Sequence, residues 1–369
     1  MNLKKTLILV VVIFLIVLLF GAIKNLKNDS QSIKTGSVIC GDEICSKNET
    51  KSNCPNDCDE ITCREFYGTI ESNCIKKGWE KLTIDVNGIE REILWDAPEI
   101  WSNGAIIALH GGEGTYVLMC GPVPKEQNRF LSDTFRGVPA VEFGELAVEQ
   151  GFAVFSLNSA YNRATDMNGL PIGKRWDSLM QDKKNIDLDF IEKVIDETIP
   201  SLRPANSKSD IFMTGISNGG FMTVLASTHF NEKVTAFAPV ASGDPYGMYF
   251  DMTKKQPLRK CGPGTWRDLE TNKEIHHEES CKSDSYLNEK QWPTTTKNVP
   301  FKQFFHEGDG GIHISCMKKT RDLLVENEYK DAGAFIIDNP NGKRTLEKHF
   351  WHSEYNQPIL DFFKEYSTN

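Results

Sequence analysis

Residues 210–223 read DIFMTGISNGGFMT, and this stretch decides the fold. It begins with an apolar run, which is typical of a strand buried on both faces of a parallel sheet. It ends with apolar residues at helical spacing. At the junction, Gly215 and Gly219 flank Ser217 in a G-x-S-x-G pattern. The stretch therefore predicts a strand, a tight turn and a helix, with Ser217 at the tip of the turn.

This kind of turn can present a serine as a nucleophile. An attacking hydroxyl must stand clear of the sheet on a strained turn, and flanking glycines relieve the crowding there. The alternative is a glycine-rich turn in which Ser217 only caps the helix. The predicted strand and helix favour the nucleophile, because the pentapeptide is specific only in that context.

Strands and helices alternate on both sides of this turn. An alternating segment on each side of Asn87-Gly88 predicts a β-hairpin. The later alternation predicts a mostly parallel sheet with helices on both faces. The predicted strands cover 81–86, 91–97, 104–112, 151–158, 210–215, 234–242, 301–308 and 333–338, and the predicted helices cover 140–150, 187–202, 218–230, 315–327 and 358–366.

Residues 7–23, LILVVVIFLIVLLFGAI, form an uninterrupted apolar run behind Lys4 and Lys5. At ~1.5 Å per residue the run covers roughly 26 Å, which a bilayer accommodates by thinning. The run is longer than the apolar core of a typical signal peptide, and no small-x-small cleavage pattern follows. We predict that residues 1–23 are a retained membrane anchor rather than a cleaved signal peptide, with the following residues outside the cytoplasm.

The ten cysteines support export, because disulfides persist outside the cytosol. Six of them lie between Cys40 and Cys74, where few aliphatic residues could build a core. We predict that residues 24–77 form a linker and a small disulfide-stapled segment. Carboxylate and amide oxygens in this segment leave a calcium module as the alternative.

The remaining residues, 78–369, are expected to form one catalytic domain. Residues 243–300 interrupt its strand–helix pattern and are interpreted as an insertion. Within it, Cys261 and Cys281 are predicted to pair, which leaves Cys120 and Cys316 as the remaining two cysteines.

The loop after the predicted strand at 104–112 could help to stabilise an oxyanion. Acyl transfer needs backbone N–H groups directed at the developing negative charge. We expect one N–H from Asn218, next to the nucleophile, and one from Gly112 or Glu113. His110 is interpreted as an orienting residue of this loop. Aromatic residues such as Tyr116 and Trp176 could line an acyl or aryl pocket or be ordinary packing.

An acid and a base should follow the nucleophile in that order. Asp309 lies just past the end of an apolar strand, with Glu307 as its competitor. His349 and His352 both follow the last predicted strand, so the spacing leaves the choice of base open.

From about residue 104 onward the chain resembles the secreted polyester-depolymerase and feruloyl-esterase group of α/β-hydrolases, often described as poly(3-hydroxybutyrate) depolymerase-like. The matching pieces are LHGG, DLDFIEKVID, DIFMTGISNGGFMT, HEGD and HFWH. In that family the catalytic histidine sits in a G-H-x-W context, which implies His349, with Lys348 in place of the glycine. The family's acid follows H-G-x-x-D, which implies Asp309 although one residue is missing here. The family's cysteine after LHG is absent.

The resemblance implies an α/β-hydrolase fold and a serine esterase that forms an acyl-enzyme without a metal or organic cofactor. Expected substrates are small or polymeric esters, such as polyester, feruloyl or acetyl esters. The alternatives are a serine peptidase of the prolyl-oligopeptidase type, although no propeller repeats are seen, and a non-catalytic surface-binding protein. A metal site at residues 276–279 is not favoured, because adjacent histidines point in different directions.

Nucleic acid is not an expected partner. The chain carries a net charge of −9, and a protein that binds phosphates needs a basic surface. The expected partners are therefore the ester substrate and, through residues 1–23, the membrane.

The predicted anchor has a direct test. Carbonate washing should leave the protein in the membrane pellet, and protease added to intact cells should release the catalytic domain, because residues 7–23 span the bilayer. A mature soluble form that begins near Lys24 would show a cleaved signal peptide instead.

Overall fold

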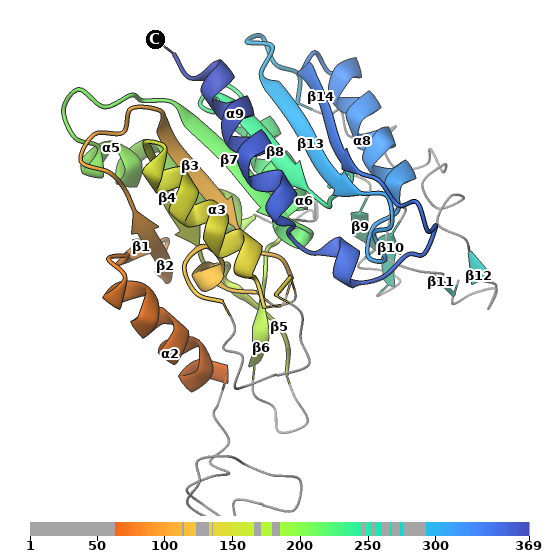
Figure 1. Cartoon of the computed structure of the whole chain (residues 1–369), viewed down its shortest axis with the longest axis horizontal. Helices are drawn as coiled ribbons and strands as arrows, with labels where there is room; N and C mark the ends of the chain where they lie inside the picture. Colours follow the sequence, from red (N-terminus) through yellow and green to blue (C-terminus); the bar gives the residue numbers. More distant parts are fainter. Residues whose placement is uncertain are drawn as a thin grey trace, which may run out of the picture. The chain divides into compact units, whose positions relative to one another are not determined.

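The computed structural model describes residues 63–112, 114–122, 133–134, 136–165, 171–178, 185–245, 248–251, 256–259, 266–267, 274–275 and 293–368 (Figure 1). All of them lie in one compact unit, which runs from residue 62 to residue 369.

An eight-stranded sheet forms the centre of this described unit, in the order β1-β2-β4-β3-β7-β8-β13-β14. β2 pairs antiparallel with both β1 and β4, and the other neighbouring pairs are parallel. The mostly parallel sheet is therefore confirmed. Its strands are β1 (Glu80–Val86), β2 (Ile89–Asp96), β3 (Gly104–Leu109), β4 (Phe152–Leu157), β7 (Ile211–Ile216), β8 (Ala236–Val240), β13 (Pro300–His306) and β14 (Lys330–Ile337).

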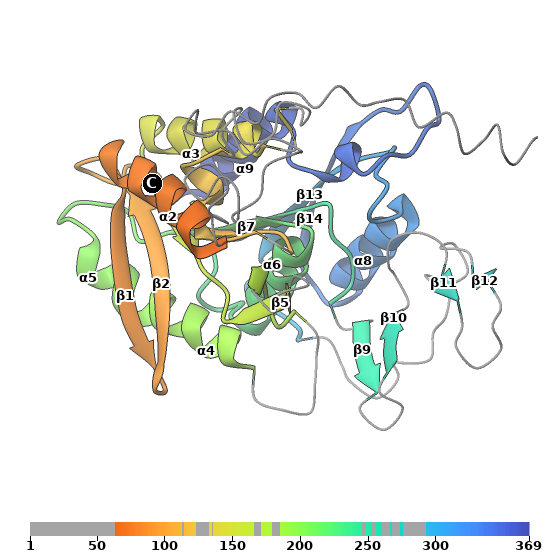
Figure 2. The ribbon, with the colours of Figure 1, turned by 90° about the horizontal axis from the view of Figure 1, so that it is seen from below.

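Helices cover both faces of the sheet, with α3 and α9 on one side and α4 and α6 on the other (Figure 2). Along β3, Ile107 packs in the core cluster of α4 and α6, and Ile106 packs in that of α3 and α9. This burial on both faces explains the continuous apolar strands of the sequence. The helices are α2 (Cys63–Lys76), α3 (Val138–Glu149), α4 (Ile186–Lys193), α5 (Ile199–Leu202), α6 (Asn218–His229), α8 (Ile314–Glu326) and α9 (Asn356–Tyr366).

This strand order, with a sharp turn from the central strand β7 into α6, is the α/β-hydrolase fold that the sequence predicts. The predicted hairpin is also present, because β1 and β2 meet at Asn87 and Gly88, both with positive φ. Such angles belong to the two-residue turns that match the strand twist.

The predicted helix at 187–202 differs from the observed one in its second half. A π-turn over Val194–Thr198 separates α4 from the short α5. Pro200 explains the break, because it has no N–H to donate to the carbonyl four residues earlier.

Helix α2 lies in the stretch assigned from sequence to the linker and Cys-rich segment. Its Ile70 and Cys74 are buried in the same core cluster as α3, and Cys74 forms a disulfide with Cys120. The backbone at Gly121 comes so close that a Cβ there would lie 2.1 Å from the Ile70 side chain. Helix α2 therefore packs in the same unit as the sheet, ahead of the expected domain start at residue 78.

Cys120, which the sequence left with Cys316 as one of the two remaining cysteines, forms its disulfide with Cys74 of the N-terminal cluster. Cys316 is disulfide-bonded too, so its partner is a different cysteine. The sequence assigned Cys74 to the N-terminal cluster, because no pattern indicated that α2 folds back onto the sheet. Cys261 and Cys281 lie outside the described residues.

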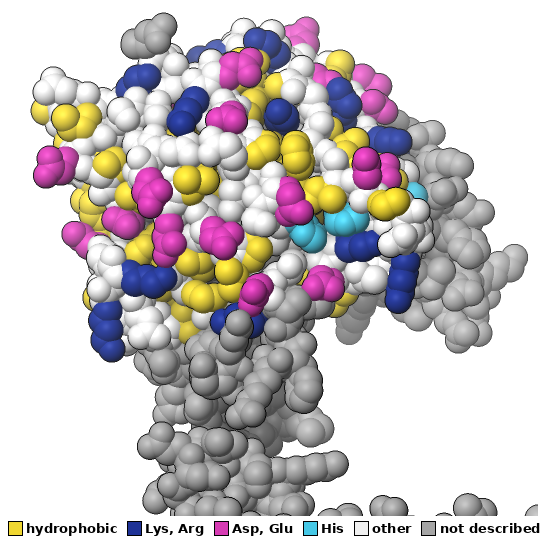
Figure 3. All heavy atoms as spheres, in the orientation of Figure 1, with side chains coloured by type: hydrophobic (Ala, Val, Ile, Leu, Met, Phe, Trp, Pro, Cys, Tyr) yellow, Lys and Arg dark blue, Asp and Glu magenta, His cyan; other side chains and the backbone are white. Residues whose placement is uncertain are grey.

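The predicted anchor at 7–23 also lies outside the described residues, as does most of the Cys-rich segment. No helix in the described ranges is long and apolar enough to cross a bilayer. The described part of the insertion contains two small hairpins, β9–β10 and β11–β12, with strands Met248–Asp251, Gln256–Arg259, Trp266–Arg267 and Glu274–Ile275. Acidic and basic side chains are interspersed over the face seen in Figure 3.

Replacing both Cys74 and Cys120 with Ala should destabilise the domain. The disulfide joins residues 46 apart in sequence, and opening a loop of that length costs about 4 kcal/mol on the chain-entropy model. Urea unfolding should show a lower midpoint and a larger denaturant slope, because the unfolded chain becomes more expanded. An unchanged midpoint and slope would contradict this role.

Candidate active site

Ser217 lies between the end of β7 at Ile216 and the start of α6 at Asn218. Its φ of 54° and ψ of −119° are a left-handed conformation that a residue with a side chain rarely adopts. The Ser217 N–H donates to the Val240 carbonyl on β8, at 3.0 Å, and thereby fixes the turn. The hydroxyl is thus presented at the carboxyl edge of the sheet.

Gly219 allows this turn to approach the neighbouring strand. A Cβ at Gly219 would lie 2.2 Å from the carbonyl oxygen of Leu109 at the end of β3. No side chain fits in that space, so the second glycine of the motif is required by a backbone-to-backbone approach.

A chain of hydrogen bonds connects Ser217, His349 and Asp309. His349 Nε2 lies 2.8 Å from Ser217 Oγ, and His349 Nδ1 lies 2.9 Å from both carboxylate oxygens of Asp309. His349 and Asp309 are buried, whereas Ser217 is partly exposed. The arrangement can move a proton from the serine hydroxyl to an imidazole that a carboxylate orients.

Asp309 is held by the turn that follows β13. Its Oδ1 accepts hydrogen bonds from the N–H groups of Gly311, at 2.6 Å, and Ile312, at 2.8 Å. A Cβ at Gly311 would lie 2.5 Å from the His349 ring. The turn therefore fixes the carboxylate and also leaves room for the imidazole.

The tryptophan of the H-x-W pattern anchors the His349 loop. Trp351 is buried against Phe143 of α3, with ring centroids 5.1 Å apart. Its indole N–H donates to Asn356 Oδ1 at 2.8 Å, and Asn356 Nδ2 donates to the Pro139 carbonyl at 2.9 Å. The pattern thus pairs a histidine at the site with a tryptophan that attaches its loop to α3.

The two competing residues lie elsewhere. Glu307 is exposed, and its carboxylate accepts from the Asn339 N–H at 3.3 Å. The His352 ring packs 5.4 Å from the His306 ring, and burial lowers the pKa of His352. The structure therefore brings together Asp309 and His349, the two residues that the resemblance implied.

Of the expected oxyanion donors, Asn218 directly follows Ser217 and Gly112 belongs to the loop after β3. The Asn218 N–H is in the first turn of α6, where N–H groups have no acceptor within the helix. A Cβ at Gly111 would lie 3.7 Å from Ser217 Cβ, so the loop after β3 lies beside the serine. This loop forms a turn through Gly112, closed by Gly114 N–H donating to Gly111 O at 3.0 Å. Glu113 lies outside the described residues.

His110 is buried at the start of this loop, and both ring nitrogens contact backbone. Nδ1 lies 2.7 Å from the Gly111 carbonyl, and Nε2 accepts from the Ser159 N–H at 3.3 Å. Burial lowers the pKa of His110 to about 3. The ring is therefore neutral at physiological pH and orients the loop, in agreement with the interpretation from sequence.

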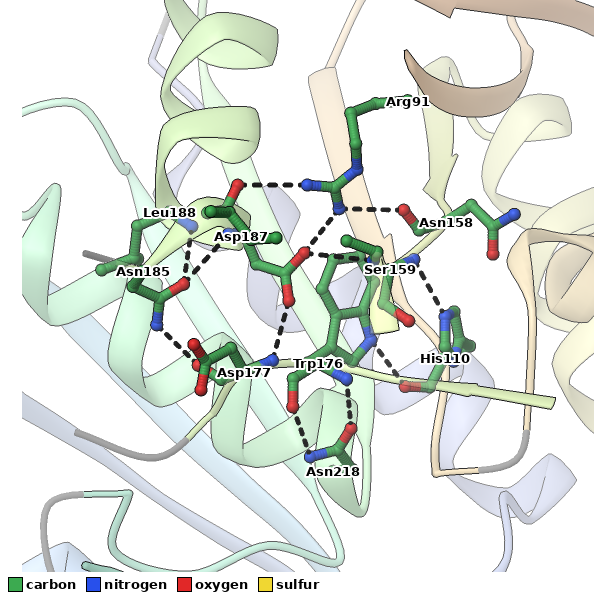
Figure 4. Close-up of polar contacts among 12 residues, drawn as sticks. Arg91, His110, Asn158, Ser159, Trp176, Asp177, Asn185, Asp187, Leu188 and Asn218 are labelled. Carbon is green, nitrogen blue, oxygen red and sulfur yellow. Dashed lines mark hydrogen bonds and ion pairs between the residues drawn. The ribbon is translucent and has the colours of Figure 1, made fainter. Parts of the chain in front are cut away.

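A buried polar network beside the site was not expected from sequence (Figure 4). At its centre Arg91 and Asp187 form an ion pair of 2.5 Å, and both side chains are buried. Trp176 and Asn218 belong to the same network. Trp176 and Tyr116, candidates for a pocket, are both buried. The only indication of Asp187 in the sequence was its position as an acidic residue at the start of a predicted amphipathic helix.

No group of three or more His, Cys, Asp or Glu side chains in the described part of the chain could hold a metal ion. Residues 276–279, considered above, lie outside that part.

Several solved structures are similar to the chain at low identity. A thermostable esterase is 17% identical, with 79% of this chain and 64% of that chain covered and a TM-score of 0.43. An esterase of Pyrococcus furiosus is 14% identical, with 79% and 93% covered and a TM-score of 0.45. Est1E of Butyrivibrio proteoclasticus, with ferulic acid bound, is 17% identical, with 77% and 96% covered and a TM-score of 0.41. No family model and no curated protein sequence matches the chain.

The buried neutral His110 should make stability depend on pH. Its pKa is about 3 in the folded protein and about 6.5 when unfolded, so the unfolded chain binds the proton first as pH falls. Its contribution is complete above about pH 6.5 and is lost as the pH falls toward 3.

Urea unfolding at pH 7 and at pH 5 would measure this effect. Between these values the wild type should lose about 2 kcal/mol more of its unfolding free energy than a His110→Gln variant, at about 1.4 kcal/mol per pKa unit. Other titrating groups are common to both proteins and cancel. Parallel pH dependences would contradict a neutral His110.

Proposed function

We propose that the protein is a serine hydrolase that cleaves carboxylic esters, with Ser217 as nucleophile, His349 as base and Asp309 as the acid that orients the base. The observation that carries the proposal is the hydrogen-bond chain from Ser217 Oγ through the His349 imidazole to the Asp309 carboxylate. The strained turn at Ser217 supports it, because such strain is common at functional sites.

In the first half of the reaction, His349 Nε2 accepts the hydroxyl proton of Ser217 as Oγ attacks the ester carbonyl carbon. Asp309 accepts a hydrogen bond from His349 Nδ1–H, which fixes the tautomer and stabilises the imidazolium. The carbonyl oxygen becomes an oxyanion and takes hydrogen bonds from Asn218 N–H and from the loop at Gly112 and Glu113.

The imidazolium then donates its proton to the leaving alcohol, and the carbon–oxygen bond of the ester breaks to give an acyl-Ser217 intermediate. Water attacks this intermediate while His349 accepts the water proton. As the second oxyanion collapses, the bond between the acyl carbon and Ser217 Oγ breaks, the imidazolium returns the proton to Oγ, and the acid is released. Each proton moves through His349, so these steps need no cofactor.

The finer proposal is that the acyl group is aryl or hydroxyalkanoic, as in feruloyl esters and polyesters. The HFW and HEGD segments support it through their resemblance to the depolymerase-like and feruloyl-esterase group. The competing proposal is a peptidase of the prolyl-oligopeptidase type. Rates on p-nitrophenyl, feruloyl and hydroxybutyrate esters, compared with rates on peptide anilides, separate the two.

We further propose that the enzyme works outside the cytoplasm, held in the membrane by residues 7–23. The Cys74–Cys120 disulfide supports this location, because structural disulfides persist in oxidising compartments. The enzyme then acts on esters that reach the cell surface from outside or lie within the envelope.

Ser217→Ala and His349→Ala should each lower ester turnover by about 10⁴-fold or more, because either change removes proton transfer from the nucleophile. A fluorophosphonate probe should add one adduct to the wild type by intact mass and none to Ser217→Ala.

His352→Ala is the matched control, because His352 is a half-buried histidine three residues from His349 and contacts His306 instead. It should keep most of the activity. Full probe labelling of Ser217→Ala would refute the nucleophile, and a larger loss in His352→Ala than in His349→Ala would refute the base.

A further inference from the structure

Residues 176–178 connect the two parts of the site that supply oxyanion donors. They follow the hairpin of β5 (Tyr161–Thr165) and β6 (Pro171–Arg175) and pass beside both α6 and the loop after β3 (Figure 4). The Lys174 N–H of β6 donates to the Gly114 carbonyl at 3.0 Å, so the hairpin is also joined to the end of that loop.

The carboxamide of Asn218 is bound on both sides by this segment. Its Oδ1 accepts from the Trp176 N–H at 2.6 Å, and its Nδ2 donates to Ser178 Oγ at 2.7 Å. A longer contact of 3.3 Å joins Nδ2 to the Trp176 carbonyl. The residue that carries the N–H beside Ser217 therefore has its side chain fixed at both ends.

Trp176 also binds the other donor loop. Its indole Nε1–H donates to the His110 carbonyl at 2.9 Å, and its ring lies 5.0 Å from the His110 ring. Both rings are buried. One residue thus sets the separation between the start of α6 and the loop that contains Gly112.

Asp187 fixes the backbone of residue 177. Its Oδ2 accepts from the Asp177 N–H at 2.7 Å, and Asn185 Nδ2 donates to the Asp177 carbonyl at 2.6 Å. Asp187 Oδ1 pairs with Arg91, which also donates to the Asn158 and Ile186 carbonyls. Because a buried charge needs complete pairing, the position of Asp187 is strongly determined.

We propose that the Asn218 carboxamide is a positioning group that directs the Asn218 N–H and, through Trp176, sets its distance from the donor loop, with Asp187 holding the connecting segment. The inference rests on the proposed hydrolase function. The ends of helices fray, and the N–H groups of the first turn have no partner within the helix to hold them. Oxyanion donors act because they are already oriented before the reaction. The effect therefore falls on the chemical step and not on substrate binding.

Asn218→Ala tests this directly, because alanine keeps the backbone N–H and suits a helix. With p-nitrophenyl acetate, kcat should fall about 10- to 100-fold while KM stays within about twofold; deleting a donor outright costs about 10²- to 10³-fold. Fluorophosphonate labelling should slow by the same factor as kcat and still reach one adduct per chain.

Asn231→Ala is the matched control, just past the other end of α6. The Asn231 carboxamide donates to the carbonyls of Thr228 and Thr294, so its loss also removes hydrogen bonds that join two segments. It should lower the thermal midpoint without changing kcat. The inference fails if only a fraction of the Asn218→Ala protein is labelled but that fraction reacts at the wild-type rate. The carboxamide would then have a merely structural role.

Ser178→Ala and Asp187→Asn test the connection. Each should lower kcat, and each should have little further effect in the Asn218→Ala background, because all act through the same donor. Should Asp187→Asn fail to fold, Ser178→Ala carries the test. Additive losses would overturn the inference. If Ser217 is not labelled in the wild type, the proposed function fails as well, whereas normal wild-type labelling with an unchanged Asn218→Ala rate refutes the inference alone.

Discussion

The backbone of Ser217 stands in a left-handed conformation that costs about 1–3 kcal/mol, and the surrounding structure is arranged to hold it there. The turn rests against β3 through Gly219 and against β8 through the Ser217 N–H. Those contacts come from the strands on both sides of β7, so the turn depends on β3 and β8 being in place.

Most of the fold could be predicted from the sequence, because strands buried on both faces are continuous apolar runs, as in β3 and β7. The role of Ser217 could be predicted as well, because the motif and the strand and helix that flank it are adjacent in sequence. Asp309 and His349 are 92 and 132 residues away, and only the resemblance separated them from Glu307 and His352. Each competitor has the same chemistry and nearly the same position, so the deciding factor was the three-dimensional course of a loop.

What could not be predicted depends on contacts between distant segments. From sequence, Asp187 is an ordinary acidic residue at the start of a helix. Only the fold places Arg91 of β2 beside it, and the residues around each give no indication of an ion pair. The pairing of Cys74 with Cys120 likewise requires α2 to pack in the same unit as the sheet. The sequence of α2 has only a few apolar residues, so it gives little indication of a face that packs there. The spacing and the number of the cysteines are by themselves compatible with several pairings.

The position of the Cys74–Cys120 bond has a mechanical consequence. Helix α2 precedes β1, and β1 is an edge strand that pairs only with β2 in the described sheet. Tension applied to the chain ahead of α2 reaches Cys74 before it reaches β1, and the covalent bond passes it to Cys120 beside the interior strands. The edge hairpin then carries no load. A domain pulled from its N-terminal side would resist as one body instead of unzipping strand by strand.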